Sequence, residues 1–438
     1  MKDVLKTGSK LPKWGKLVVL LFGIAAAAIA GLQFYNLRHF KETVVSSPEL
    51  TEVQMLSDYL PSLRGTWADT PVFIYDSGVE GGSVLFMGNV HPYEPATSLA
   101  AYIMMENIHV EKGKVFIVPE TNRSGSTTGM LGSAYPMFFN IETEWGRKTY
   151  RIGDRTTNPL DQWPDPFTYV HYPDGQNLAY QDIRNMNRTY PGRADGTLTE
   201  RASYAVMEMI RENDIDISID AHEASITYPV VATYVTHQRA EDAAMMASMM
   251  LTAMNFDMKC EVSPMGLRGL SHREWGDFSD TYAVLMETPE PFIDRINGPM
   301  TEDLFKDGKD VFLQAAADKK LVYTTSYSAT EEALERNLEE DPRAILGFPL
   351  WYRVGRHLSG AAEFVSQVGM FEPEKEVIAT WPLYEELEAN DCGYYLHNPE
   401  DYADSEGNYK MSGAAWDFFY GGYYHRGSKS NRSLVFEI

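Results

Sequence analysis

Four side chains of the sequence could together bind a metal ion and transfer a proton. They supply two imidazoles and a carboxylate as ligands, and a further carboxylate that can move protons. Such a ligand set leaves the fourth position of a tetrahedral zinc ion open, which is typical of a catalytic site, because structural sites are closed by four protein ligands. The four residues are His91, Glu94, His222 and Glu287.

The first two of these residues follow an apolar segment at a tight turn. Residues 83–87 are a strand candidate that leads into His91, and Glu94 lies three positions further on. Pro92 and Pro95 keep the neighbouring residues out of α geometry, and Pro95 suits the first position of a following helix. The turn therefore fixes both side chains between a strand and a helix.

The other two residues follow similar apolar segments. Residues 215–219 run into Asp220 and His222, and residues 283–286 run into Glu287. Charge at the end of a buried strand is costly unless it has a partner or a metal ion. Ligands of open α/β sheets bind at the carboxyl ends of the strands, so we expect all four side chains at one rim of the sheet.

A further polar segment, IRNMNRTYPG, covers residues 183–192. Arg188 offers a planar fork that suits a carboxylate, and Asn187 adds neutral donors. By itself the segment would be interpreted as a capped turn with an exposed arginine. Beside a metal site, the pair predicts binding of an anionic group.

Four motifs, in this order, resemble the zinc carboxypeptidase superfamily, which also contains the aspartoacylase and succinylglutamate desuccinylase group. They are GNVHPYE, NMNR, IDAHE and VLMET, and the resemblance covers roughly residues 70–300. It implies one zinc ion per chain, bound by His91, Glu94 and His222. It also implies that Glu287 is the general base and acid.

The same resemblance implies roles for the polar segment and for an arginine upstream of it. Asn187 and Arg188 would hold the carboxylate next to the scissile amide. Carboxypeptidases use a further arginine to polarise the carbonyl group, and Arg147, Arg151 and Arg155 are all available here. Arg147 is the preferred candidate, because its Trp-x-Arg-Lys setting is the most similar.

Three features differ from the usual pattern of the superfamily. Asn185 stands where an Asp usually pairs with the first zinc histidine, so an amide replaces a charged partner. No Tyr lies between Tyr234 and Tyr282, where carboxypeptidases carry a substrate-capping Tyr, and this favours a deacylase. The separation of His222 from Glu94, 222 − 94 = 128, favours a carboxypeptidase, because aspartoacylase-like enzymes are more compact there.

These observations predict a zinc metallohydrolase that cleaves an amide or peptide bond next to a free carboxylate. Its substrate would be a small peptide, as for a metallocarboxypeptidase. The alternative is a deacylase of N-acyl amino acids, like aspartoacylase or succinylglutamate desuccinylase. A catalytically silent relative that binds peptide in the same cleft is an alternative of another class, against which the intact metal and base residues count.

Short apolar runs alternate with longer helical patterns, which is typical of an α/β sheet protein. With the resemblance, this predicts a mixed, mostly parallel central sheet flanked by helices, with an N-terminal membrane segment and a C-terminal extension. Residues 121–197 lack periodicity and predict a long ordered excursion over one sheet edge. We expect strands at residues 72–75, 83–87, 114–118, 215–219, 230–235 and 283–286, and helices at residues 96–106, 198–213, 240–254 and 301–317.

The N-terminus has the pattern of an export signal. Five lysines precede an uncharged apolar run at residues 17–32, and Phe34 and Tyr35 extend it to interfacial depth. Either a retained anchor spanning residues 17–35 or a signal peptide cleaved near Ala30 fits this pattern. Both predict an exported protein, either membrane-anchored with its catalytic domain on the extracytoplasmic side, or periplasmic or secreted.

The domain prediction follows from these segments. Residues 1–44 would be the cytoplasmic basic stretch with the anchor or signal peptide, and residues 45–324 the catalytic domain. Residues 325–438 would be a C-terminal extension or small second domain, with an acidic helix at 330–341 and a strand at 433–438. The methionine-rich helix at residues 244–254 is expected to pack against the sheet.

Composition narrows the classes of partner and ligand. The 438 residues include 38 Lys and Arg against 62 Asp and Glu, a formal charge of −24, so nucleic acid is not an expected partner. Cys260 and Cys392 are the two cysteines, and they form either one disulfide or two unpaired thiols. Since there is no Cys-x-x-Cys, the metal site must use His and carboxylates.

Overall fold

The computed structural model describes residues 12–129, 136–226, 228, 230–254, 256, 258–293, 295–319, 347–402 and 434–437. The chain forms two compact units, Met1–Phe40 and Lys41–Ile438. The first unit contains helix α1, Lys13–His39, whose apolar window has a mean hydropathy of 2.4 and is not buried. Its 27 residues span about 40 Å, enough for a hydrocarbon core of about 30 Å. By length and composition, α1 fits a membrane anchor or the apolar part of a signal sequence.

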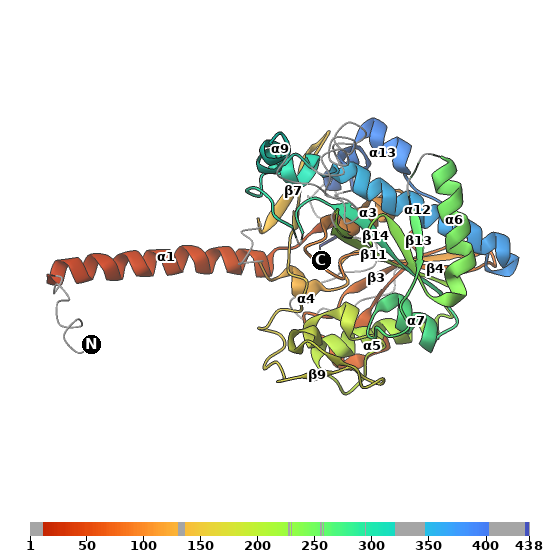
Figure 1. The fold of residues 1–438 in the computed structure, drawn as a ribbon, viewed down its shortest axis with the longest axis horizontal. Helices are drawn as coiled ribbons and strands as arrows, with labels where there is room; N and C mark the ends of the chain where they lie inside the picture. Colours follow the sequence, from red (N-terminus) through yellow and green to blue (C-terminus); the bar gives the residue numbers. More distant parts are fainter. Residues whose placement is uncertain are drawn as a thin grey trace. The chain divides into compact units, whose positions relative to one another are not determined.

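An eight-stranded mixed sheet forms the centre of the second unit (Figure 1). Its order is β13-β12-β14-β11-β4-β6-β3-β2, and four neighbours, β14, β11, β4 and β6, run parallel to one another. The sheet thus confirms the predicted fold class. The strands are β2 (Glu52–Met55), β3 (Pro71–Asp76), β4 (Ser83–Met87), β6 (Lys114–Val118), β11 (Ile217–Ser225), β12 (Thr233–Thr236), β13 (Lys259–Val262) and β14 (Tyr282–Glu290).

Helices cover both faces of this sheet, because alternate apolar residues of each strand point to opposite sides. In β4, Val84 and Phe86 join one buried cluster, while Leu85 and Met87 join the other. In Figure 1, α3 and α12 lie above the sheet, and α5 and α7 lie below it. The first cluster includes α3 (Pro95–Asn107), α6 (Glu241–Ala253) and α12 (Leu350–Phe371), and the second includes α2 (Leu56–Tyr59), α5 (Leu198–Glu212) and α7 (Ser271–Phe278).

Shorter helices, strand pairs and turns surround this core. The excursion at residues 121–197 contains α4 (Arg123–Ser126), hairpin β7 (Phe138–Thr143) and β8 (Gly146–Arg151), the short pair β9 (Tyr169–Val170) and β10 (Asn177–Leu178), and the 3-10 turns η3 (Tyr180–Arg184) and η4 (Met186–Arg188). The remaining pairs are β1 (Thr43–Ser46) with β16 (Leu434–Glu437), and β5 (His109–Lys112) with β15 (Ile378–Thr380). The remaining helices are α8 (Glu302–Asp307), α9 (Val311–Ala317) and α13 (Tyr384–Asn390), with turns η2 (Pro61–Leu63), η5 (Gln238–Ala240), η6 (Pro373–Lys375), η7 (Cys392–Tyr395) and η8 (Pro399–Tyr402).

Two predicted helices differ from the structure in an instructive way. The helix expected at residues 301–317 is divided into α8 and α9, because Gly308 takes a left-handed φ of 68° and ends α8. The methionine-rich helix α6 packs through Ala243, Ala244, Ala247 and Leu251, which are buried. Met245, Met246, Met249 and Met250 are exposed, so the predicted packing of this helix is made by its small residues and Leu251 and not by its methionines.

The described C-terminal residues belong to the same compact unit as the sheet. Helix α12 buries one face in the first cluster, including Val354 and Phe364. The Tyr234 hydroxyl donates to the Gly360 carbonyl at 2.7 Å, which links β12 to α12. Residues 347–402 therefore form a layer of the core, while the acidic helix predicted at 330–341 lies outside the described residues. The two cysteines, Cys260 and Cys392, are unpaired thiols.

A substitution in α12 tests whether this layer and the sheet unfold together. Phe364 is fully buried against Tyr234, so Phe364→Ala should lower the free energy of unfolding of the full-length protein by about 3–5 kcal/mol. Met370 is 72% exposed on the same helix, and Met370→Ala should change it by less than about 0.5 kcal/mol. Urea unfolding monitored by tryptophan fluorescence measures both. A separate transition for the C-terminal part, with the sheet unaffected, would contradict the single core.

Candidate metal centre

The turn between β4 and α3 carries two of the predicted site residues. Glu94 is the N-cap residue of α3 and Pro95 its first residue, and the Glu94 amide donates to the His91 carbonyl at 2.9 Å. The Thr97 hydroxyl donates to the Glu94 carbonyl at 2.7 Å and accepts from the Asn89 amide at 2.9 Å. These bonds close the turn on itself, so His91 and Glu94 are held on the same side.

The other two residues lie directly opposite each other in the central sheet. β11 and β14 are parallel, and their register pairs His222 with Glu287. Both strands extend further than the sequence predicted, to Ser225 and Glu290, so these side chains lie within strands and not after them. Strand backbone on both sides makes their positions more rigid than loop positions would be.

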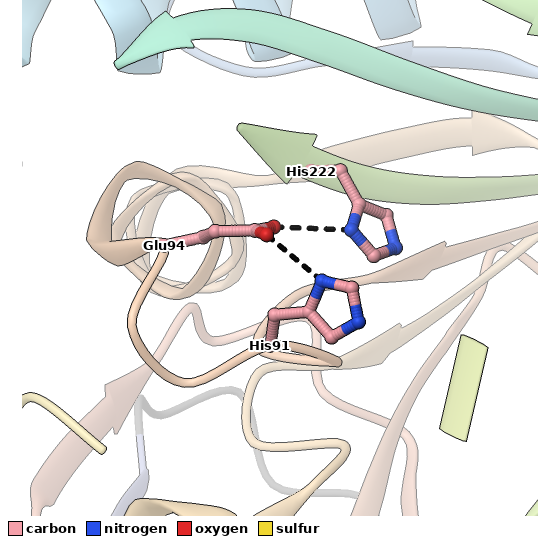
Figure 2. A group of neighbouring side chains, drawn as sticks. All are labelled: His91, Glu94 and His222. Carbon is pink, nitrogen blue, oxygen red and sulfur yellow. Dashed lines mark hydrogen bonds and ion pairs between the residues drawn. The ribbon is translucent and has the colours of Figure 1, made fainter. Parts of the chain in front are cut away.

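Three of the four side chains converge on one point (Figure 2). The Glu94 carboxylate contacts His91 Nδ1 through Oε1 at 2.8 Å and His222 Nδ1 through Oε2 at 3.0 Å. One potential ligand atom from each residue lies within 4.8 Å of the others, and all three residues are buried. Figure 2 shows both imidazole rings turned toward the Glu94 carboxylate. This donor set suits a zinc ion with an open coordination position.

The outer nitrogen of each histidine also has a partner. His91 Nε2 lies 2.9 Å from the Asn185 Oδ1, and His222 Nε2 lies 3.0 Å from the Asp220 Oδ2. The Ser271 hydroxyl in turn donates to Asp220 Oδ2. Such partners fix the ring orientation and the tautomer of metal-binding histidines. His91 is therefore paired with the amide of Asn185 in place of the more usual carboxylate, whereas His222 is paired with the carboxylate of Asp220.

The charges at the cluster favour a bound cation. Burial opposes ionisation of Glu94, but His91 and His222 lower its pKa to about 2. Burial likewise opposes charge on His222, yet Asp220 and Glu94 raise its pKa well above the usual range. The pKa of His91 is lowered, mainly by burial. The ionised Glu94 carboxylate thus stabilises positive charge at the cluster, and a metal ion would supply that charge in place of the His222 proton, because a ligating imidazole must be neutral.

Glu287 is the fourth member and lies beside this cluster. Burial raises its pKa to about 8, and Glu94 and Asp220 add to the shift although His222 opposes it. Its Oε2 atom is buried and has no hydrogen-bond partner among the residues that the structure describes. A buried carboxyl group with a raised pKa and an available oxygen can accept and return a proton near neutral pH.

A cavity of about 390 Å³ contains this site. Asn187 and Arg188 line it from turn η4, where the Asn185 Oδ1 accepts from the Asn187 amide at 2.9 Å. The Asn187 Oδ1 accepts from the Ser271 amide at 2.9 Å, which connects η4 to the start of α7. Burial lowers the pKa of Arg188 and nearby Arg155 adds to this shift, so two positive groups face the same cavity.

The three arginines proposed for polarising the carbonyl group differ in their surroundings. Arg147 is an exposed residue near the start of hairpin strand β8, where it pairs with Glu142 at 2.9 Å, and it does not line the cavity. Arg151 is buried in an ion pair with Glu42 at 2.6 Å. Arg155 lines the cavity together with the metal cluster. The structure thus does not bring the preferred Arg147 to the site, because its hairpin carries it outward.

The cavity also contains residues that sequence reasoning did not identify. His272, in the first turn of α7, is buried, and neither ring nitrogen has a partner among the described residues. Burial, with Arg273 and His222, lowers its pKa well below the usual value, so it is uncharged. Tyr93 and Tyr228 also line the cavity, although the sequence has no Tyr between Tyr234 and Tyr282, where carboxypeptidases carry one. Of these additional cavity residues, Tyr93 alone could have been identified from the sequence, since it lies inside the GNVHPYE motif.

No family model and no curated protein sequence matches the chain. Solved structures with a similar fold include an ectoine utilization protein from Ruegeria pomeroyi, with 19% identity, a TM-score of 0.30, and coverage of 50% of this chain and 53% of that one. An aspartoacylase family protein from Mesorhizobium loti has 16% identity, a TM-score of 0.32, and coverage of 57% and 65%. Bovine thrombin-activatable fibrinolysis inhibitor has 12% identity, a TM-score of 0.36, and coverage of 74% and 92%.

These likenesses concern the fold alone, because every identity is below 25% and every TM-score is below 0.5. The chain spans about half the length of the first structures found: 53% of the ectoine utilization protein, 53% of a succinylglutamate desuccinylase from Silicibacter and 42% of a succinylglutamate desuccinylase/aspartoacylase from Rhodobacter sphaeroides. Since their identities are low, the function of this chain has to be argued from its own side chains.

A glycine behind η4 tests the positioning of Arg188. Gly269 has a φ of +82°, and a Cβ there would collide with the Arg188 carbonyl. Gly269→Ala should therefore lower the free energy of unfolding by about 1–3 kcal/mol and displace the Asn187–Arg188 turn. Gly266, in the same loop, has open space around it, so Gly266→Ala is the matched control. Urea unfolding of both variants checks this, and equal effects would contradict the close approach.

Proposed function

We propose that the protein is a zinc-dependent hydrolase of an amide or peptide bond next to a free carboxylate, and that it acts outside the cytoplasm. One observation carries the proposal. His91, Glu94 and His222 form a buried metal-binding set, and Glu287 lies beside them with an oxygen that has no partner among the described residues. The same cavity contains Arg155 and Arg188, so metal, base and anion-binding groups are present together.

His91, Glu94 and His222 would hold the metal ion, one per chain. When bound, zinc would supply Lewis acidity and lower the pKa of a water molecule from about 15.7 towards 7. Glu287 would accept the proton from this water and deliver it to the leaving amine, which its raised pKa favours. Because Glu287 lies opposite His222 in the ladder, the two residues are held in a fixed register.

The positive groups of the cavity would orient the substrate. Arg188, with Asn187, would bind the substrate carboxylate through charge-assisted hydrogen bonds. Arg155, in place of the more exposed Arg147, would donate to the carbonyl oxygen as negative charge develops on it. His272 lines the same cavity and would offer a neutral donor or acceptor to the substrate. Arg188 and Arg155 would thus bind the carboxylate and the carbonyl group of one short segment.

Peptides with a free C-terminus are the proposed substrates, as for a metallocarboxypeptidase. N-acyl amino acids present the same amide and carboxylate, and a deacylase would use the same residues. A silent peptide-binding protein would need neither Glu287 nor the residues that could bind a metal ion, and the chain has both. Helix α1 supports export, either as a membrane anchor or as a signal sequence.

Substrate panels with and without a chelator test the proposal. The purified full-length protein should hydrolyse C-terminally free peptides or N-acyl amino acids, lose activity with 1,10-phenanthroline, and recover it with zinc. Amidated peptides should be poor substrates, because they lack the carboxylate that Arg188 would bind. Liquid chromatography with mass spectrometry measures each product, and equal turnover of amidated peptides would contradict the role of Arg188.

The matched variant for this test is Glu287→Gln. It should lower kcat by about 10²–10⁴ through loss of the proton-transfer group. Zinc content, measured by atomic emission, should stay at one per chain, because Glu287 is not among the proposed ligands. A variant that retained full activity would exclude Glu287 as the base, and a wild-type protein without stoichiometric zinc would favour the silent binder.

The two arginines make a second matched pair. Arg155→Ala should lower kcat by about 10²–10³, because a donor to the developing negative charge is lost. Arg147→Ala removes only an exposed ion pair with Glu142 and should leave kcat nearly unchanged. Steady-state kinetics on the best substrate of the panel compares them. The reverse order of effects would return the role to Arg147.

A further inference from the structure

Glu223, a buried residue next to the metal cluster, links the strand that carries His222 to Glu94 and the helix that follows it. Glu223 follows His222 on β11, and its backbone amide donates to the Glu94 Oε2 at 3.0 Å. Its side-chain Oε2 accepts from the Ala96 amide at 2.8 Å, at the start of α3. One residue therefore bonds to the carboxylate of a metal-binding residue and to the helix that follows it.

The other carboxylate oxygen of Glu223, Oε1, accepts a hydrogen bond from an arginine in the C-terminal part of the chain. Arg353 of α12 donates through Nη1 to the Glu223 Oε1 at 2.7 Å, and both side chains are fully buried. Arg353 also donates through Nη2 to the Phe305 carbonyl at 2.8 Å, in helix α8. The planar guanidinium thus joins α12 and α8 to the strand that carries His222.

A buried ion pair of this kind is a poor source of stability. Removing two charges from water costs several kcal/mol per ion, and a well-packed apolar pair often stabilises a fold equally well. A second buried carboxylate lies close by, since Glu223 and Arg353 both influence the pKa of Glu290, which burial raises. Geometry gives a better account of the pair, because it positions segments that are 130 residues apart in the chain.

We propose that Arg353 is a positioning residue of the metal centre. It holds Glu223, and Glu223 holds the Glu94 carboxylate and the first turn of α3 in line with His222. The C-terminal layer of the core thereby sets the geometry of the metal-binding residues without touching the metal ion. This inference rests on the proposed zinc site, and it assigns a role to a part of the chain that carries no recognised motif.

Zinc affinity of the full-length protein tests this role independently of catalysis. Arg353→Met should raise the Kd for zinc by about 10–100-fold, as expected for loss of a group that orients metal ligands. Competition with a chromophoric chelator measures this Kd on the apoprotein. Arg353→Lys keeps the charge but offers no planar fork, so it should give an intermediate Kd.

Arg356→Met is the matched control on the same helix. Arg356 is also buried, but it donates to the Tyr352 hydroxyl at 2.6 Å and packs over Phe256, away from Glu223. This variant should destabilise α12 while keeping the zinc Kd within about threefold of wild type. Equal weakening by both arginine variants, or an unchanged Kd in Arg353→Met, would overturn the proposal.

A double variant separates positioning from a simple effect on folding. Arg353→Met with Glu223→Gln removes both charges, so the thermal stability of the apoprotein should recover relative to Arg353→Met alone. The zinc Kd should remain raised, because the link to α12 is still missing. Full recovery of the Kd would overturn the positioning role. If the wild-type protein itself bound no zinc, the proposed function would fail, and this outcome is distinct from a wild-type Kd in Arg353→Met.

Discussion

The parallel pairing of three adjacent strands determines the arrangement of the site. β4, β11 and β14 are neighbours with matched direction, so the residues at or beyond their carboxyl ends meet at one rim. Hydrogen bonding in the ladder fixes the register of His222 with Glu287, and a shift of either strand by one residue would point its side chain to the opposite face. The turn that carries His91 and Glu94 follows β4, so its position also depends on this pairing.

Burial of so many charged groups shapes the surroundings of the site. Several buried polar side chains near the rim have a partner from a different element, such as Asn185 for His91 and Arg353 for Glu223. An unpaired charge in such a place would cost several kcal/mol, so the layers around the sheet cannot be exchanged freely. The excursion and the C-terminal layer are therefore parts of the site, although neither carries a metal ligand.

Local sequence located β4, β11 and β14 because apolar runs meet charged residues there, although β11 and β14 extend beyond their predicted ends to Ser225 and Glu290. His91, Glu94, His222 and Glu287 could be named from that pattern and from the motifs. The arginine that lines the cavity could not be named, because the candidates Arg147, Arg151 and Arg155 lie within nine residues of one another. The direction of hairpin β7–β8 decides which of them reaches the cavity. A contact with a distant part of the chain fixes that hairpin, since Trp145 Nε1 donates to the Leu396 carbonyl at 2.8 Å. No local sequence pattern predicts this contact. His272 and Arg353 are likewise defined only by tertiary contacts.

The pairing of β1 with β16 joins the two ends of the second unit, with Thr43 opposite Glu437. β1 cannot acquire this neighbour until residues 434–437 have been synthesised, so this ribbon forms late and closes a loop that contains nearly all of the second unit. Trimming of the C-terminal residues would leave the backbone groups of β1 without their partner and open a strand edge to other chains.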